Sequence, residues 1–98
     1  MFLVQRINTR PSTLVQFYAS TDEYAEHFQI TYREQGLVLF DSRTLSDDLM
    51  TLTIDTVWRD EAALNEYLAD PVVQEMISVR DAYLAENNID VVRKANPI

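Results

Sequence analysis

Apolar and polar residues alternate along several stretches of the chain, most clearly between residues 49 and 58. One face of an extended strand there carries Met50, Leu52, Ile54, Thr56 and Trp58, and the other face carries Thr51, Thr53, Asp55 and Val57. The first face is typical of a buried core, whereas the second is partly polar. Residues 2–8 and 37–45 are also rich in strand-forming side chains, and residues 89–94 form a last candidate strand.

Short polar segments separate these elements. The run Ser46, Asp47 and Asp48 has the chemistry of a hairpin turn between the two central strands. Ser20 with Glu23 three residues later forms a capping box, which predicts a first helix that runs to about residue 35. Gly36, the only glycine of the chain, suits the positive φ that ends such a helix.

The segment after residue 58 predicts two consecutive helices. Asp60 is the expected cap of a short helix at residues 61–69. Asp70 followed by Pro71 then starts a longer helix, because aspartate favours the cap position and proline the first helical position. One stripe of the longer helix consists of Val73, Met76, Ile77, Arg80 and Leu84.

The order strand, helix, strand, strand, helix, strand predicts an α+β fold of the ferredoxin-like β-α-β-β-α-β type with an antiparallel sheet. Helices cover one face of such a sheet. The other face, with Val57 among threonines, is too apolar for bare solvent, so we expect the sheet of a second copy to cover it and form a homodimer. With 98 residues, the chain is expected to form a single domain spanning residues 1–98.

Composition narrows the functional classes. The net charge of −8 repels phosphate backbones and argues against nucleic acid as a partner. The absence of cysteine excludes disulfides and thiol nucleophiles, and the single histidine, His27, excludes a histidine-based metal cluster. We therefore expect no metal and no cofactor. No apolar run reaches the length of a membrane span, so we expect no membrane contact. The absence of cysteine suits a reducing cytoplasm, so we expect a cytoplasmic location.

One region carries a family resemblance. Its residues are Thr56, Val57 and Trp58, followed by Asp60, Ala63, Leu64, Tyr67, Asp70 and Pro71. This run resembles the antibiotic biosynthesis monooxygenase branch of the dimeric α+β barrel superfamily, which also has haem-degrading relatives. The resemblance covers nearly all of the chain in element order, but at the level of motifs it covers only residues 56–77. It implies a dimeric barrel in which two sheets pack face to face.

The resemblance also carries expectations about chemistry. Haem-degrading members of that superfamily use an asparagine on the first strand, a tryptophan on the second helix and, ten residues later, a histidine that ligates iron. Asn8 matches the first, but Tyr67 and Ile77 stand at the other two positions, so haem breakdown is not expected. Cofactor-free members oxidise electron-rich aromatic compounds in a pocket lined by an asparagine, a tryptophan and sometimes a tyrosine, which Asn8, Trp58 and Tyr67 resemble.

Each candidate residue has a simpler explanation beside its functional one. Trp58 and Tyr67 are favoured as packing residues, and Asn8 as a turn residue at a strand end, with roles in a pocket as the alternatives. His27 lies on the border of the first helix's aromatic face, to which Tyr24 belongs. A partly exposed imidazole without a specific partner is favoured there, and contact with a ligand is the alternative.

Three arginines fall on predicted strands, namely Arg6, Arg43 and Arg93. A guanidinium that faces the barrel binds a carboxylate through two hydrogen bonds, whereas the simpler alternative is a cross-strand pair with Asp41 or Asp55.

The sequence thus predicts a small homodimeric barrel that binds an aromatic small molecule and, if it is an enzyme, acts as a cofactor-independent monooxygenase. The candidate catalytic residues are Asn8 and Tyr67, and the candidate pocket residues are Trp58, His27, Arg6 and Tyr24. The alternative is a non-enzymatic dimerisation or ligand-sensing module of the same fold.

Overall fold

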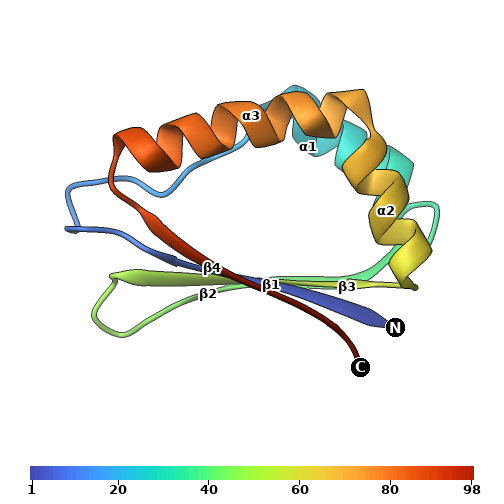
Figure 1. Cartoon of the computed structure of the whole chain (residues 1–98), viewed down its shortest axis with the longest axis horizontal. Helices are drawn as coiled ribbons and strands as arrows, with labels where there is room; N and C mark the ends of the chain where they lie inside the picture. The colour runs from blue at the N-terminus through green and yellow to red at the C-terminus, as the bar shows by residue number, and fades with distance from the viewer.

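The computed structural model describes residues 1–98 and has two layers, a sheet and a set of helices that cover one of its faces (Figure 1). The elements follow the order β1 (Phe2–Thr9), α1 (Asp22–Phe28), η1 (Gln29–Arg33), β2 (Val38–Leu45), β3 (Thr51–Trp58), α2 (Glu61–Ala69), α3 (Pro71–Glu86) and β4 (Asp90–Pro97). The sheet is antiparallel with the strand order β2-β3-β1-β4. The predicted ferredoxin-like α+β fold is therefore confirmed.

The faces of the sheet follow the alternation in the sequence. Phe2, Val4, Leu52 and Trp58 are buried beneath the helices, and they occupy even positions of β1 and β3. The core continues through Tyr32, Ala63, Leu64 and Val73 of the helical layer. Because side chains alternate between the faces of a strand, the odd positions of β1 and β3 point away from the helices.

The first helix differs in detail from the prediction. Thr21, rather than Ser20, caps α1, because its side-chain oxygen accepts a hydrogen bond from the Tyr24 N–H at 3.2 Å. Serine and threonine are both good caps, so the residue types alone do not decide between these two neighbouring positions. The last part of this helical segment is a π-helix, η1, which no feature of the sequence predicts.

The end of this helical segment confirms the role predicted for Gly36. Its φ is 73°, a conformation that glycine adopts without the steric cost of a side chain. The Gly36 N–H donates to the Arg33 carbonyl at 3.1 Å, and the Leu37 N–H donates to the Tyr32 carbonyl at 2.9 Å. This pair of bonds is a Schellman motif, and it turns the chain directly into β2.

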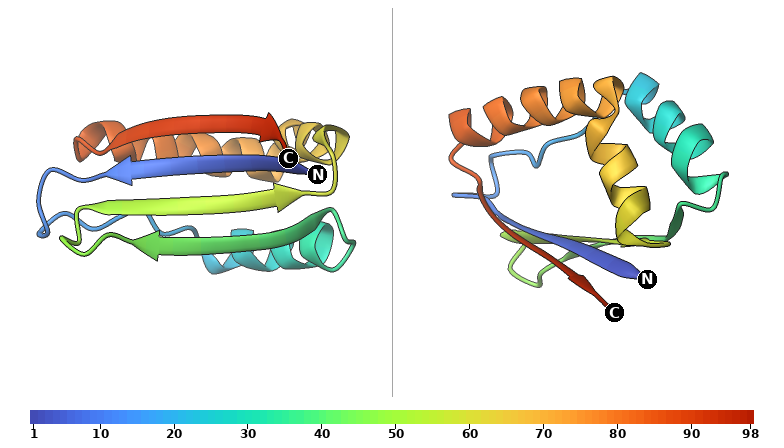
Figure 2. Two further views of the ribbon diagram at one scale, coloured as in Figure 1. Left: turned by 90° about the horizontal axis from the view of Figure 1, so that it is seen from below. Right: turned by 45° about the vertical axis from the view of Figure 1, so that its right-hand side comes forward.

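The two predicted aspartate caps are confirmed. Asp60 Oδ1 accepts a hydrogen bond from the Ala63 N–H at 2.8 Å and starts α2. Asp70 Oδ1 accepts one from the Val72 N–H at 2.9 Å, with Pro71 as the first residue of α3. The chain thus bends sharply between α2 and α3 (Figure 2, right), and at this bend Asp70 contacts His27 of α1.

The outer face of the sheet has no helix over it (Figure 2, left). Only 12 of the 98 residues are buried, because the helices enclose one side of the sheet alone. Phe40, paired with Val57 across β2 and β3, is 59% exposed on the outer face, and Val92 of β4 is 54% exposed. No helix of the structure has both the length and the apolar character that a membrane crossing requires.

Candidate ligand-binding cavity

A cavity of about 290 Å³ lies between the sheet and the helices. Its walls come from all four strands, from α1, α2 and α3, and from the loop before α1, which contributes Phe17 and Tyr18. Its volume lies near the lower end of the range of small-molecule sites. The cavity is therefore large enough for one compound of a ring or two.

Aromatic side chains form one part of the cavity wall. The ring centroids of Trp58 and Tyr67 are 4.8 Å apart, and Phe28 meets both rings edge-on at 6.3 and 5.8 Å. Trp58 is only 2% exposed, so most of its surface packs against protein and the remainder faces the cavity. The packing role favoured for Trp58 is thus present, and it coexists with a place in the cavity wall.

Asn8 is the second-to-last residue of the central strand β1, where it pairs with Leu52 of β3 and Val91 of β4 rather than lying in a turn. Its side chain is buried and lines the cavity, and its Nδ2 donates to the Leu52 carbonyl at 3.2 Å and to the Arg6 carbonyl at 3.3 Å. Both hydrogen bonds use the amide nitrogen. The side-chain oxygen has no protein donor, which leaves it as an acceptor on the cavity side. The turn role favoured from the sequence is wrong, because β1 continues through Thr9.

Two phenols meet at the cavity wall. The hydroxyl groups of Tyr24 and Tyr67 are hydrogen-bonded to each other. Burial raises the pKa of Tyr24 strongly, and the neighbouring Tyr67 raises it further. Burial also raises the pKa of Tyr67, while its hydrogen bond with Tyr24 and the charge of Arg80 act in the opposite direction. Both phenols are therefore protonated at neutral pH. One hydroxyl donates to the other, which leaves one O–H of the pair free to donate to a ligand.

Five arginines line the same cavity, together with a single acid, Asp41. These arginines are Arg6, Arg33, Arg43, Arg80 and Arg93. Arg33 is paired with Asp41, and Arg80 with Asp81 at 3.1 Å. Arg6, Arg43 and Arg93 have no carboxylate within ion-pair distance, so the cross-strand pairs favoured for them from the sequence are not formed. Asp55 is instead hydrogen-bonded to Gln5 on the outer face.

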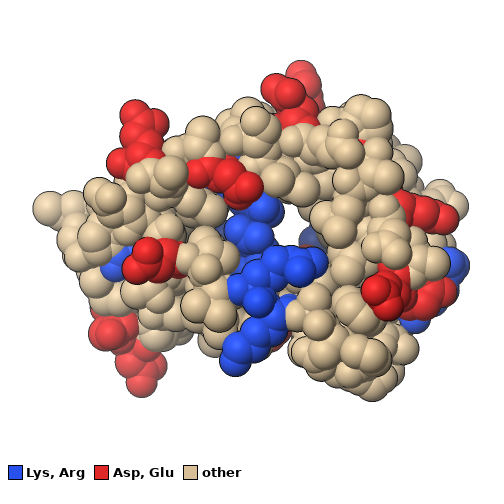
Figure 3. Space-filling view, viewed as in Figure 1, with Lys and Arg blue, Asp and Glu red and all other residues tan.

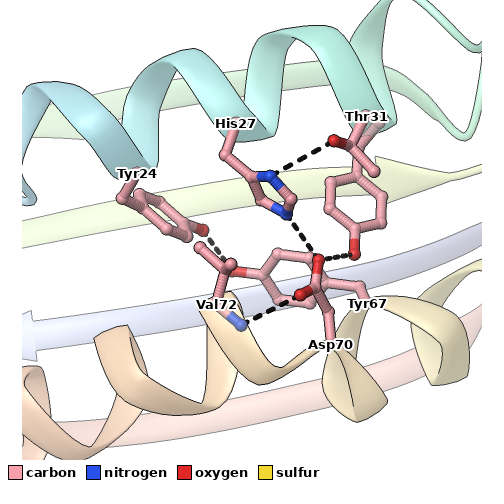
Figure 4. A network of polar contacts seen from close by, with 7 residues as sticks. Tyr24, His27, Thr31, Tyr67, Asp70 and Val72 are labelled. Atoms are coloured by element: carbon pink, nitrogen blue, oxygen red, sulfur yellow. Dashed lines mark hydrogen bonds and ion pairs between the residues drawn. The ribbon is translucent and has the colours of Figure 1, made fainter.

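A polar cluster lies beside the cavity, at the bend between α2 and α3 (Figure 4). Asp70 Oδ2 accepts hydrogen bonds from His27 Nε2 at 2.5 Å and from the Tyr32 hydroxyl at 2.6 Å. The other imidazole nitrogen of His27 is 3.4 Å from the Thr31 hydroxyl. Burial acts to raise the pKa of Asp70, but the hydrogen bonds from Tyr32, His27 and the Val72 N–H outweigh it, so that pKa is lowered.

The structure brings most of the predicted site residues together. Asn8, Tyr67, Trp58, Arg6 and Tyr24 all line the cavity. The sixth, His27, does not line it. The expectation that His27 lacks a specific partner is wrong, because its imidazole is held by Asp70. The catalytic and ligand-binding roles of these residues stay predictions.

Two residues of this region, Arg80 in the cavity and Asp70 in the polar cluster beside it, have functional contacts that the sequence analysis does not predict. Arg80 was noted only as a member of the apolar stripe of α3, although a charged residue on the buried face of a helix was a usable signal. Asp70 was recognised as a helix cap but not as the partner of His27. No pattern links those two residues, which are separated by 43 positions.

Comparison of the structure with solved structures identifies the class of fold. A provisionally assigned antibiotic biosynthesis monooxygenase from Deinococcus radiodurans superposes with a TM-score of 0.60 over 100% of this chain and 92% of that protein, at 16% sequence identity. A second antibiotic biosynthesis monooxygenase superposes with a TM-score of 0.55 over 100% of this chain and 99% of that protein, at 19% identity.

No protein-family model matches the sequence, and no curated protein matches it. The chain therefore has the ferredoxin-like fold of antibiotic biosynthesis monooxygenase-like proteins, and the resemblance expected from residues 56–77 is confirmed at the level of the fold.

Proposed function

We propose that this protein is a homodimeric α+β barrel that binds a small aromatic molecule in the cavity and oxidises it with dioxygen without a cofactor. One observation carries the proposal: the cavity combines an aromatic wall of Trp58, Tyr67 and Phe28 with the polar side chain of Asn8. Flat rings pack well against such a wall. The fold shared with two antibiotic biosynthesis monooxygenases supports the choice of chemistry.

The residues of the cavity have complementary tasks in this proposal. The Tyr67 hydroxyl donates a hydrogen bond to the ligand, and the Asn8 side-chain oxygen accepts one, which together orient the ring. The nearby guanidinium groups favour the ionised form of a bound phenol, since an opposite charge within a few ångströms lowers a pKa. A phenolate is richer in electrons than a phenol and reacts more readily with dioxygen.

The test of binding and turnover uses dihydroxybenzenes. At 100 times its Kd, a ligand that binds only the folded state stabilises it by about 2.7 kcal/mol, which a thermal melt detects. Turnover is followed as oxygen consumption under the same conditions. Tyr67→Phe, which keeps the ring and removes the hydroxyl, should lower the rate, whereas Tyr83→Phe removes a hydroxyl outside the cavity and should not.

The outcomes separate two functions. Binding together with oxygen consumption that depends on Tyr67 supports the monooxygenase proposal. Binding without oxygen consumption favours the second candidate, a ligand-sensing module of the same fold. If the protein shows neither binding nor oxygen consumption, both proposed functions are refuted.

The dimer is the second part of the proposal, and the exposed outer face of the sheet supports it. Phe40, Val57 and Val92 share that face, and an apolar sheet surface of this kind is normally covered. The chain should sediment at about twice 11.4 kDa at micromolar concentration. Val57→Asp should weaken the dimer by placing a charge where water is excluded.

A matched control is available on the helical layer. Val79 of α3 is 51% exposed and lies away from the outer face of the sheet, so Val79→Asp should leave the dimer intact. A native chain that sediments as a monomer, or equal effects of the two aspartates, would contradict this part of the proposal.

A further inference from the structure

The three unpaired arginines of the cavity belong to one row across the sheet. In the strand register, Arg43 of β2 lies opposite Ile54 of β3, Ile54 lies opposite Arg6 of β1, and Arg6 lies opposite Arg93 of β4. Residues that face each other across neighbouring strands point to the same side of the sheet. The row therefore presents three guanidinium groups to the cavity, and all three line it.

Placing Arg6 directly opposite Arg93 is unfavourable in the absence of an anion, because like charges at paired positions of neighbouring strands repel each other. Arg80 adds a third positive charge from α3 above the same part of the sheet. Burial, followed by the charge of Arg80 and a smaller contribution from Arg93, lowers the pKa of Arg6. The neighbouring Asp81 offsets this only in part.

The distribution of charge over the whole chain makes the row more unusual. The chain has 16 acidic and 8 basic residues, yet five of the basic residues line one cavity and only one acidic residue does. Figure 3 shows basic side chains gathered around an opening between sheet and helices, with acidic side chains spread over the rest of the visible face. The protein thus has a positive interior space within a negative surface.

Arginine is the residue best suited to hold a carboxylate, because its planar group offers parallel N–H donors. Building on the proposed function, we infer that the aromatic ligand carries a carboxylate, which binds between Arg6 and Arg93. Tyr67 lines the same cavity as Arg6 and Arg93. One aromatic acid therefore contacts the arginine row with its carboxylate and the Trp58–Tyr67 wall with its ring.

The experiment compares 3,4-dihydroxybenzoate with 3,4-dihydroxybenzamide, which has the same ring and hydroxyl groups but no charge. Isothermal titration measures the Kd of both for the native protein and for the variants Arg6→Gln, Arg93→Gln and Arg59→Gln. Arg59 is paired with Asp60 outside the cavity and serves as the matched control.

The native protein should bind the benzoate at least about tenfold more tightly than the benzamide, as expected for charge-assisted hydrogen bonds to arginine. Arg6→Gln and Arg93→Gln should each remove most of that preference, and Arg59→Gln should preserve it. The preference should also decline as salt is added, because salt screens the ion pair.

Two results would overturn the inference alone, and a third would count against the proposed function on which it rests. Equal binding of the two compounds would refute the carboxylate while leaving the proposed aromatic site intact. Binding of acetate or inorganic phosphate as tightly as the benzoate would show an anion site without aromatic selectivity. Binding of neither aromatic compound would instead count against the proposed function itself.

Discussion

Arg6 offers the sharpest test of how this cavity is built, because its removal should stabilise the protein and weaken the binding of an acidic ligand. The side chain is half-buried, faces Arg93 across the strand pair and forms no hydrogen bond or ion pair. Methionine has a similar length and no charge. In most proteins a buried residue of this length contributes stability, so a gain in the free energy of unfolding when it is replaced is unusual.

The magnitude follows from the environment of the guanidinium. The lowered pKa of Arg6 means that the folded state disfavours its charged form, and this cost applies at every pH below the folded-state pKa, including neutral pH. Relief of one like-charge cross-strand pair is worth about 0.2–1 kcal/mol. For a domain of this size, each 1 kcal/mol shifts Tm by about 4–8 °C. Arg6→Met should therefore raise Tm by about 1–8 °C.

Urea denaturation of the native protein and of Arg6→Met, at one fixed protein concentration, measures the change in the free energy of unfolding. Arg59→Met, at an exposed position outside the cavity, should change it little. The same variants are then titrated with an aromatic carboxylate, whose binding only Arg6→Met should weaken. A loss of stability greater than about 1 kcal/mol in Arg6→Met would mean that the side chain is structural and would refute this reasoning.

Three further predictions concern other parts of the molecule. Asp70→Ala should lower the free energy of unfolding by about 1 kcal/mol more than Asp70→Asn, since asparagine keeps the cap of α3 and alanine does not. Because the pKa of Asp70 is lowered in the folded state, its stabilising contribution is present above the unfolded-state value and should be lost as pH falls through the folded-state value; acid unfolding curves of these variants measure this. Burial raises the pKa of Tyr24, Tyr32 and Tyr67. An ultraviolet titration should therefore show these three phenols ionising only with unfolding, and stability should decline above about pH 10. Ferric haem should give no histidine-ligated Soret band, because Ile77 cannot ligate iron and both nitrogens of His27 have protein partners; a stoichiometric band that disappears in His27→Ala would contradict this.

The fold could be predicted because its signals are local. A helix cap depends only on one side chain and the backbone of the next three residues. Asp60 and Asp70 therefore cap α2 and α3 at the positions that the sequence predicts. Gly36 marked a backbone conformation that other residues adopt only at a cost. The alternation along β3 fixed which of its residues face the helices.

The site could be predicted only in part, because it depends on the register between distant strands. Arg6 and Arg93 were both placed on strands, but nothing in either segment says that they lie opposite each other. The contact of His27 with Asp70 depends on how α1 crosses the bend between α2 and α3. The π-helix η1 also lacked a sequence signal, since its residues fit an α-helix equally well.

The contrast between a negative surface and a positive cavity has a kinetic consequence for an acidic ligand. Repulsion by the net charge of −8 acts over about a Debye length, near 8 Å at physiological salt, and slows the approach of an anion. The arginines act only after the anion has passed that region, and they then slow its release. Added salt should therefore raise the association rate constant and raise the dissociation rate constant more steeply. Such a ligand would exchange slowly in both directions, and its residence time would report on the arginine row more directly than its affinity.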